Sequence, residues 1–244
     1  MRPSLTSRRG RAVRAPAAGP VLPRAFYARR APVVARALLG RVLESDVGGV
    51  HVAGRIVEVE AYRGPLDPAS HAFRGRTARN AVMFGPPGRA YVYFTYGMHH
   101  CLNLVCEREG GAAAVLVRAL EPLEGLEAAR RRRGVQAAER LMRGPGCVAR
   151  ALGLTRAHDG TDLVEGELRV RGRPRRDGRR VATGPRVGIR RGLEQAWRFW
   201  LDGHPCVSAP RAGRAARRAG RRREAGRRSP QPRRVRRSLG ALPR

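Results

Sequence analysis

The stretch VLESDVGGVHVAGRIVEVEAY, residues 42–62, decides the fold class. Apolar residues alternate with polar ones on both sides of Gly48 and Gly49. A period of two is typical of β-strands, and adjacent glycines supply a tight turn between them. We therefore predict one strand over 42–47 and a second over 50–62, paired as a hairpin.

The segments on either side of this hairpin extend the pattern. Apolar residues recur at helical spacing over 26–40 and predict a helix that ends at Gly40. Residues 63–90 contain several prolines and glycines and predict a long loop. An aromatic run over 91–96 and a β-like run over 99–106 predict a second hairpin with an exposed apex.

The rest of the chain adds one strand over 113–118 and then a helix with Pro122 in its first turn. A glycine-rich turn at 143–146 precedes a helix that runs through Leu152. Three further strands are expected, over 168–170, 185–189 and 197–201. Because strands come in adjacent pairs and do not alternate with helices, the fold class is α+β with mainly antiparallel strands.

Arginine dominates the charge of this 244-residue chain. The sequence has 51 Lys+Arg against 19 Asp+Glu, and all the basic residues are Arg, so the net charge is +32. A chain without lysine has no side-chain amine for a Schiff base, for pyridoxal phosphate or for a phosphate-binding P-loop. Those reaction classes are excluded.

The charge falls into three parts that suggest the domain organisation. Residues 1–24 and 209–244 carry net charges of +6 and +13 and contain few large apolar residues. We expect both to be disordered, because they bury too little surface to offset chain entropy. Residues 25–208 form the expected single domain, and their net charge of +13 favours a polyanionic partner, above all nucleic acid. Arginine-rich coding bias is an alternative explanation for the two ends.

No membrane segment, secretory signal or metal site is expected. The sequence lacks an apolar run of about 18 residues, and its four cysteines have neither the spacing nor the histidine partners of a zinc or iron–sulfur site. The Arg-rich start resembles an organelle transit peptide, so organelle targeting stays open.

Two carboxylates share one face of the second strand. The period of two places Glu58 and Glu60 beside Tyr62, with Cα atoms of successive carboxylates roughly 6–7 Å apart. Their mutual repulsion raises at least one pKa unless an arginine compensates. The alternative is a solvated strand face with alternating glutamates.

The aromatic hairpin offers a second group of candidates. Tyr91 and Tyr93 lie on one face of their strand, where they can pack as ordinary strand residues. Tyr96 lies on the other face, beside Gly97 at the apex, where an apolar wedge can enter a stack of bases.

Collinear blocks over about residues 25–208 resemble the alkyladenine (3-methyladenine) DNA glycosylase family. The blocks are GRIVEVEAY at 54–62, His71, TARN at 77–80, Met83–Phe84, YVY at 91–93, YGM at 96–98, CLN at 101–103, RALEP at 118–122, WRF at 197–199 and Val207–Ser208.

The resemblance implies a monofunctional enzyme that flips a damaged purine out of double-stranded DNA and hydrolyses its N-glycosidic bond. It implies a single domain with a curved, mainly antiparallel sheet, flanking helices and a protruding hairpin that inserts into DNA. The implied roles are Glu60 as the base that activates water, Arg118 as its partner, Tyr62, His71 and Tyr93 as walls around the flipped base, Asn103 as a gate against guanine, and Tyr96 as the inserted residue.

The partner expected is therefore double-stranded DNA with damaged purines, bound by a monomer in the cytoplasm at the nucleoid, without cofactor or metal. Two alternatives stay open: a non-catalytic basic protein that binds nucleic acid, and a carbohydrate hydrolase that uses Glu58 and Glu60. The carboxylates disfavour the first, because they weaken phosphate binding. The positive charge disfavours the second.

Overall fold

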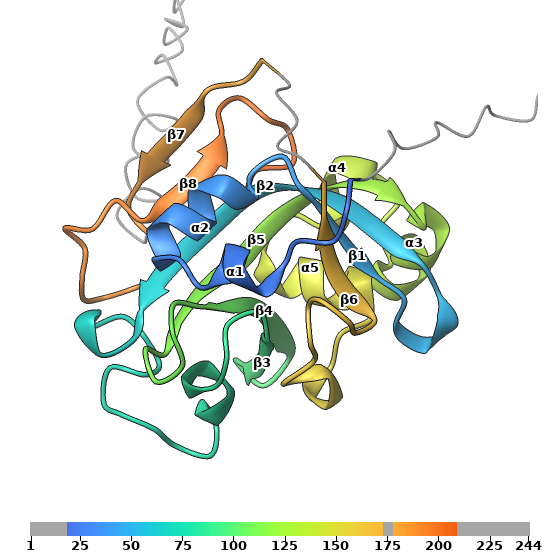
Figure 1. The fold of residues 1–244 in the computed structure, drawn as a ribbon. Coiled ribbons are helices and arrows are strands. Elements are labelled where there is room, and N and C mark those ends of the chain that lie inside the picture. The colour runs from blue at the N-terminus through green and yellow to red at the C-terminus, as the bar shows by residue number, and fades with distance from the viewer. Residues whose placement is uncertain (1–18, 173–177, 209–244) are drawn as a thin grey trace, which may run out of the picture. The chain divides into compact units, whose positions relative to one another are not determined.

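Strand β2 (Val52–Arg63) lies at the centre of an eight-stranded antiparallel sheet (Figure 1). One of its edges pairs with β5 (Ala113–Glu124) along nearly its whole length. The other edge pairs with β1 (Val42–Ser45) over the first residues of β2 and with β8 (Arg198–Leu201) over 58–60. The sheet order is β3-β4-β5-β2-β1-β6, with β7 beside β8.

The computed structural model describes residues 19–172 and 178–208, which all belong to one compact unit. This unit is α+β, as the strand pattern predicts. The expected boundary at residue 25 differs from the start of the packed chain, since Leu22 is buried and its N–H donates to the carbonyl of Val170 at 2.8 Å. Residues 1–18 and 209–244, where disordered ends are expected, lie outside the described residues.

Both expected hairpins are present. β1 and β2 pair across a short turn in which Gly48 and Gly49 have φ of 67° and 71°, values that favour glycine. β3 (Ala90–Thr95) and β4 (His99–Cys106) pair in register, with their turn at 96–98. The 63–90 segment contains only short 3-10 helices, Gly64–Leu66 and Ala81–Phe84.

The N-terminal helix is split in two. α1 covers Arg24–Tyr27 and α2 covers Ala31–Leu38, in place of the one helix expected over 26–40. Pro32 explains the break, because it has no N–H to bond to the preceding turn. The freed N–H of Ala31 donates to the Glu107 carboxylate at 3.1 Å.

The helix expected to begin at Pro122 forms, but its expected start is wrong. β5 continues to Glu124 and Pro122 lies opposite Gly54 at an irregularity of the β2–β5 register, where a strand tolerates proline. α3 (Leu126–Arg133) begins only after Gly125, whose φ is 69°. α4 (Ala138–Leu141) and α5 (Pro145–Leu152) follow, and α5 ends at Leu152 as expected but begins inside the glycine-rich turn, at Pro145.

The C-terminal strands differ in one place from those expected from the sequence. β6 (Leu168–Arg171) and β8 form as expected, and β8 pairs with β7 (Val181–Gly184). No strand forms over 185–189 in this described part of the chain, where the backbone N–H of Val187 donates to a side chain of β2.

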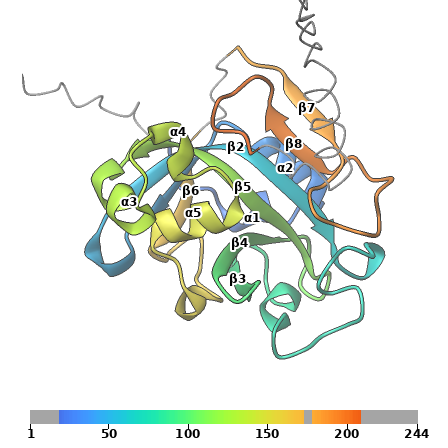
Figure 2. The same cartoon turned by 180° about the vertical axis from the view of Figure 1, so that it is seen from behind.

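Helices cover both faces of the sheet. α1 and α2 lie over one face and α5 lies over the other, as the opposite views in Figures 1 and 2 show. Most residues of β2 are buried as a result, whichever way their side chains point. No helix among residues 19–172 and 178–208 has the length and apolar character to cross a membrane.

Candidate active site

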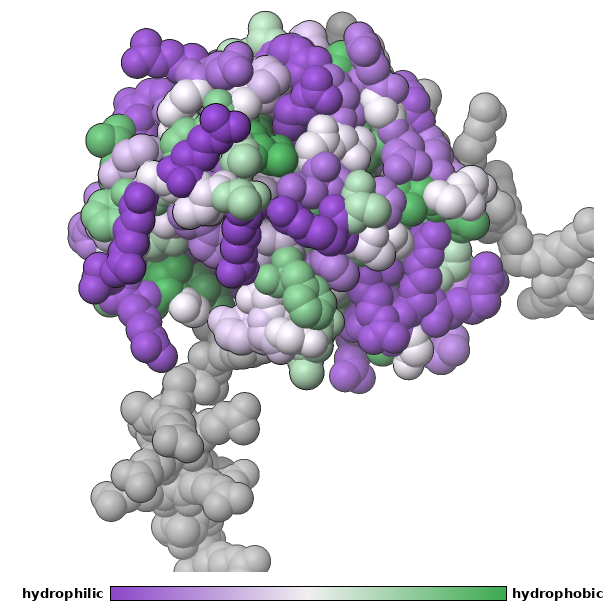
Figure 3. Space-filling view, turned by 90° about the horizontal axis from the view of Figure 1, so that it is seen from below, coloured by the Kyte–Doolittle hydropathy of each residue, from purple (hydrophilic) through white to green (hydrophobic). Residues whose placement is uncertain are grey.

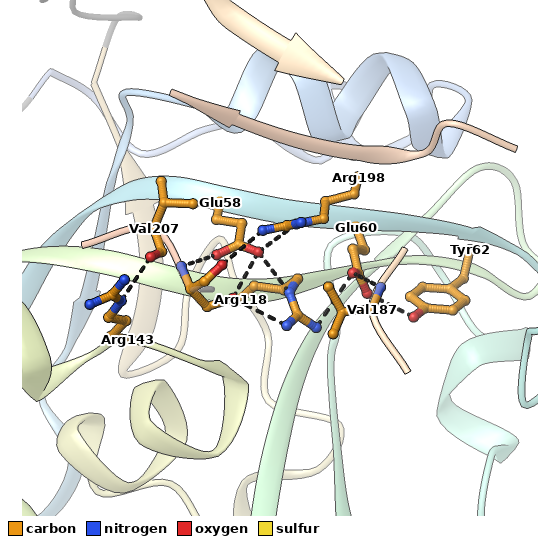
Figure 4. A network of polar contacts seen from close by, with 9 residues as sticks. Glu58, Glu60, Tyr62, Arg118, Arg143, Val187, Arg198 and Val207 are labelled. Carbon is orange, nitrogen blue, oxygen red and sulfur yellow. Dashed lines mark hydrogen bonds and ion pairs between the residues drawn. The ribbon is translucent and has the colours of Figure 1, made fainter. Parts of the chain in front are cut away.

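Glu58 and Glu60 are both fully buried in β2. The solvated-face alternative is therefore wrong for this strand, because the sheet is covered on both sides. Burying a carboxylate is costly unless donors surround it. Both carboxylates have such donors, and they come from three separate parts of the chain (Figure 4).

Glu60 is held through both of its oxygens. The Tyr62 hydroxyl donates to Oε2 at 2.9 Å, and the Val187 backbone N–H donates to Oε1 at 2.7 Å. Arg118 Nη1 lies 3.4 Å from Oε1. Tyr62 belongs to the same strand and Arg118 to β5, whereas Val187 comes from the irregular segment before β8. These contacts fix the orientation of the carboxylate.

Glu58 is the centre of a second set of contacts. Its Oε1 accepts from Arg118 Nε at 2.9 Å, from Arg198 Nε at 2.8 Å and from the Ser208 hydroxyl at 2.9 Å. Its Oε2 accepts from the Ser208 backbone N–H at 2.6 Å. Arg118 thus bridges Glu58 and Glu60, and two arginines balance two carboxylates.

A local irregularity lets Arg118 reach both carboxylates. The β2–β5 register shifts on both sides of Glu58, so Glu58 lies opposite Ala119 and Val59 opposite Val117, and Arg118 is left between these pairs. Such bulges re-aim a side chain and often occur beside active sites.

The pKa of Glu60 is raised above its ordinary value of 4.5. Burial is the largest cause, and the Glu58 charge adds to it. Arg118, the Val187 N–H and the Tyr62 hydroxyl act in the opposite direction. A carboxylate that is desolvated and yet oriented by donors has the character of a general base.

An aromatic group lies near this carboxylate. His71 and Tyr93 meet edge to face with ring centroids 4.5 Å apart, and the Tyr91 hydroxyl is 3.0 Å from His71 Nδ1. Burial, followed by Arg79, lowers the pKa of His71, so its ring is neutral at neutral pH. The pKa of Tyr62 is raised by burial, then by Glu60 and also by Tyr93.

Asn103 lies in the same row of the sheet as Glu60. Tyr91 pairs with Asn103, Asn103 with Leu116, and Leu116 with Glu60, across four neighbouring strands. Residues paired in this way point to the same face of a sheet. Asn103 is buried, and its Nδ2 donates to the Tyr91 carbonyl at 3.2 Å.

Tyr96 lies apart from the carboxylates, in the β3–β4 turn. Its side chain is 76% exposed and its φ is 52°, in the left-handed region. Phe94 and Met98 are exposed beside it in sequence. Figure 3 looks at the molecule from the side of β3 and the 64–85 segment, and this face is mostly hydrophilic with scattered apolar areas.

A family model described as methylpurine-DNA glycosylase matches residues 25–205. The chain belongs to this family. Curated relatives carry the name "Putative 3-methyladenine DNA glycosylase". One, from Burkholderia lata, is 51% identical over 198 residues, which are 79% of this chain and 93% of the relative. Relatives from Rhodopseudomonas palustris and Streptomyces avermitilis are each 51% identical over 196 residues and cover 80% and 78% of this chain, and 93% and 92% of their own lengths.

In this methylpurine-DNA glycosylase family member, the contacts of Glu60 include a donor that sequence analysis missed. The Val187 donor is a backbone N–H in an irregular segment, so no side-chain pattern indicates it. Arg198 and Ser208 lie within the blocks of resemblance, but their contacts with Glu58 span 140 and 150 residues and have no local signal.

Proposed function

We propose that this DNA glycosylase flips alkylated or deaminated purines of the 3-methyladenine type out of duplex DNA and hydrolyses the N-glycosidic bond. The product is an abasic site, and no lyase step follows. The observation that carries the proposal is the buried Glu60 carboxylate, which three donors orient, one of them the hydroxyl of the aromatic residue Tyr62.

In this mechanism Glu60 positions a water molecule and accepts its proton. The water oxygen bonds to C1′ of the sugar as the bond from C1′ to the base nitrogen breaks, and the bonding electrons leave with the base. A carboxylate has about four lone-pair sites, so Glu60 keeps acceptor capacity for water beside its protein donors. Its negative charge also stabilises the oxocarbenium character that develops at the sugar.

The aromatic side chains suit the leaving base. Tyr62, His71 and Tyr93 are assigned as the walls between which the flipped base stacks, and electron-rich rings favour a base with positive charge. A cationic base leaves as a neutral molecule and needs little acid catalysis. We assign Asn103 as the gate that disfavours the 2-amino group of guanine and Tyr96 as the residue that enters the vacated stack.

Water is the only nucleophile this mechanism requires. Glycosylases with lyase activity use an amine to form a Schiff base, and the chain contains no lysine. We expect the strand to stay intact until alkali is added. The carbohydrate-hydrolase alternative is disfavoured because the Glu58 carboxylate accepts from four protein donors.

The deciding experiment compares Glu60→Gln with wild-type protein on duplexes that each carry one defined lesion. Abasic sites are scored after alkali, and lesion binding is measured in parallel. We expect base release to fall by at least about 100-fold, the scale of general-base catalysis, while binding to lesion DNA is retained. Glu165→Gln, an exposed glutamate outside the cluster, is the matched control. Near-normal release by Glu60→Gln would support the non-catalytic alternative or another base.

A further inference from the structure

Arg186 is buried next to the Glu60 site, and sequence analysis assigns it no role. Its guanidinium forms a two-contact ion pair with Asp67, in which Nη2 to Oδ1 is 2.8 Å. Nη1 also donates to the carbonyl of Ala61 at 3.0 Å. Ala61 is the residue between Glu60 and Tyr62, so Arg186 binds the backbone of β2 at the catalytic position.

The same guanidinium lies over two aromatic rings. Its central carbon is 4.7 Å from the ring centroid of Tyr62 and 5.2 Å from that of Trp197. A cation over a phenol ring withdraws electron density, which makes the hydroxyl a stronger hydrogen-bond donor. The Tyr62 hydroxyl donates to Glu60, so the charge of Arg186 reaches that carboxylate through the ring.

The chain around Arg186 is shaped for this contact. Gly192 turns back with φ of 63°, and its carbonyl accepts from Arg186 Nη2 at 3.3 Å. A Cβ at Gly192 would lie 3.0 Å from that Nη2 and 3.3 Å from Asp67 Oδ1. The turn therefore closes over the ion pair. Val187 directly follows Arg186 in the chain, and its N–H donates to the other oxygen of Glu60.

We propose that Arg186, anchored by Asp67, is a positioning residue that holds Glu60 in its ionised and oriented form through Tyr62 and Val187. This inference rests on the proposed function of Glu60. The ion pair contacts neither of the Glu60 oxygens directly, so its effect passes through the two donors. Removing it loosens both donors at once and takes away the cation that lies over the Tyr62 ring.

Several other groups set the charge of Glu60, and the Asp67 and Arg186 variants must leave them in place. The titratable or charged groups that face it are Glu58 and Tyr62 on β2, Arg118 on β5, Tyr93 on β3 and Arg186 itself. Substitutions at Asp67 and Arg186 leave the first four unchanged.

The test measures single-turnover base release as a function of pH on a duplex with one 3-methyladenine. This base already carries positive charge, so the acidic limb of the profile reports the enzyme's base and not protonation of the leaving group. The main variant is the double substitution Asp67→Asn with Arg186→Met, which removes both charges and leaves neither buried without a partner. Arg186→Lys keeps the cation but not the planar fork.

We expect the double variant to move the acidic limb about 0.5–1 pH unit higher and to release base roughly 10-fold more slowly on the plateau. Arg186→Lys should keep the limb within about 0.2 pH unit of wild type, even where thermal unfolding shows lower stability. The proposal is overturned if the acidic limb of the pH profile is the same in the double variant as in wild type. It is also overturned if Arg186→Lys moves this limb as far as the double variant does.

Tyr62→Phe gives a second measure that does not disturb the ion pair. Loss of the hydroxyl should raise the limb by a similar amount, and the effect of the double variant should then be smaller in the Tyr62→Phe background than in wild type. If the double variant shifts the limb as far in the Tyr62→Phe background as in wild type, Arg186 does not act on Glu60 through Tyr62. Glu60→Gln separates the two claims: if it still releases base, the proposed function itself has failed, whatever the Arg186 variants do.

Discussion

At the scale of single residues, the site depends on carboxylates kept in a buried strand. Glu58 is satisfied by protein donors and holds Arg118 in place. Glu60 has weaker compensation, since Arg118 is 3.4 Å away and burial dominates its pKa. Of these two glutamates, Glu58 therefore has a structural role, and Glu60 is the one that the proposed function assigns to catalysis.

The raised pKa of Glu60 has a consequence for stability. An acid whose pKa is higher in the folded than in the unfolded chain stabilises the fold below its unfolded pKa, ordinarily 4.5, and this stabilisation is lost as pH rises through the folded pKa. At pH 7 Glu60→Gln should therefore be more stable than wild type. For a domain of this size, each gain of about 1 kcal/mol in the free energy of unfolding raises Tm by roughly 2–4 °C.

Thermal unfolding at pH 7 and pH 4 tests whether Glu60→Gln is more stable than wild type. The difference between Glu60→Gln and wild type should be larger at pH 7 than at pH 4. A variant that is less stable than wild type at pH 7 would show that the contacts with Arg118 and Val187 outweigh the cost of burying the charge.

At the scale of elements, the β2–β5 pair and the β3–β4 hairpin have separate tasks. The irregular β2–β5 register brings Arg118 between two carboxylates. The β3–β4 hairpin has a regular register and ends in an exposed turn. In the proposed function, the β2–β5 pair positions the catalytic carboxylate and the β3–β4 turn inserts into DNA.

Tyr96 in this turn is the position where we expect a change to affect base flipping and not the chemical step. Because 76% of its side chain is exposed, Tyr96→Ala should change Tm little. We expect a smaller fluorescence change with an ethenoadenine reporter, since no ring then fills the vacated stack. Tyr96→Phe keeps the ring and should behave like wild type. An unchanged signal in Tyr96→Ala removes the insertion role.

At the scale of the whole molecule, positive charge is spread far beyond the site. Residues 25–208 carry +13, and the C-terminal residues 209–244 carry another +13. Binding to DNA by charge depends on salt, because each phosphate that the protein neutralises releases counterions. In the proposed function, recognition of a lesion depends instead on the site residues of the domain.

Deletion of residues 210–244 separates these two contributions. The truncated chain keeps Ser208, which donates to Glu58, so the site is preserved. We expect the slope of log affinity against log salt to become shallower by about 0.9 for each phosphate that the deleted arginines neutralise in the full chain, with the order of lesion preference unchanged. Identical slopes would mean that this segment does not bind DNA.

Glu60, Arg118, Tyr62 and His71 stay predicted site residues. The sequence alone predicted the antiparallel α+β class and both hairpins correctly, because strand periodicity is local. It misplaced the helix at Pro122 and the strand at 185–189, where contacts with β2 outweigh local preference. Only the tertiary structure decided that both glutamates are buried, which donors hold them, and that Arg186 lies behind Tyr62. Several of those contacts join segments more than 100 residues apart, and distance along the chain erases any local pattern.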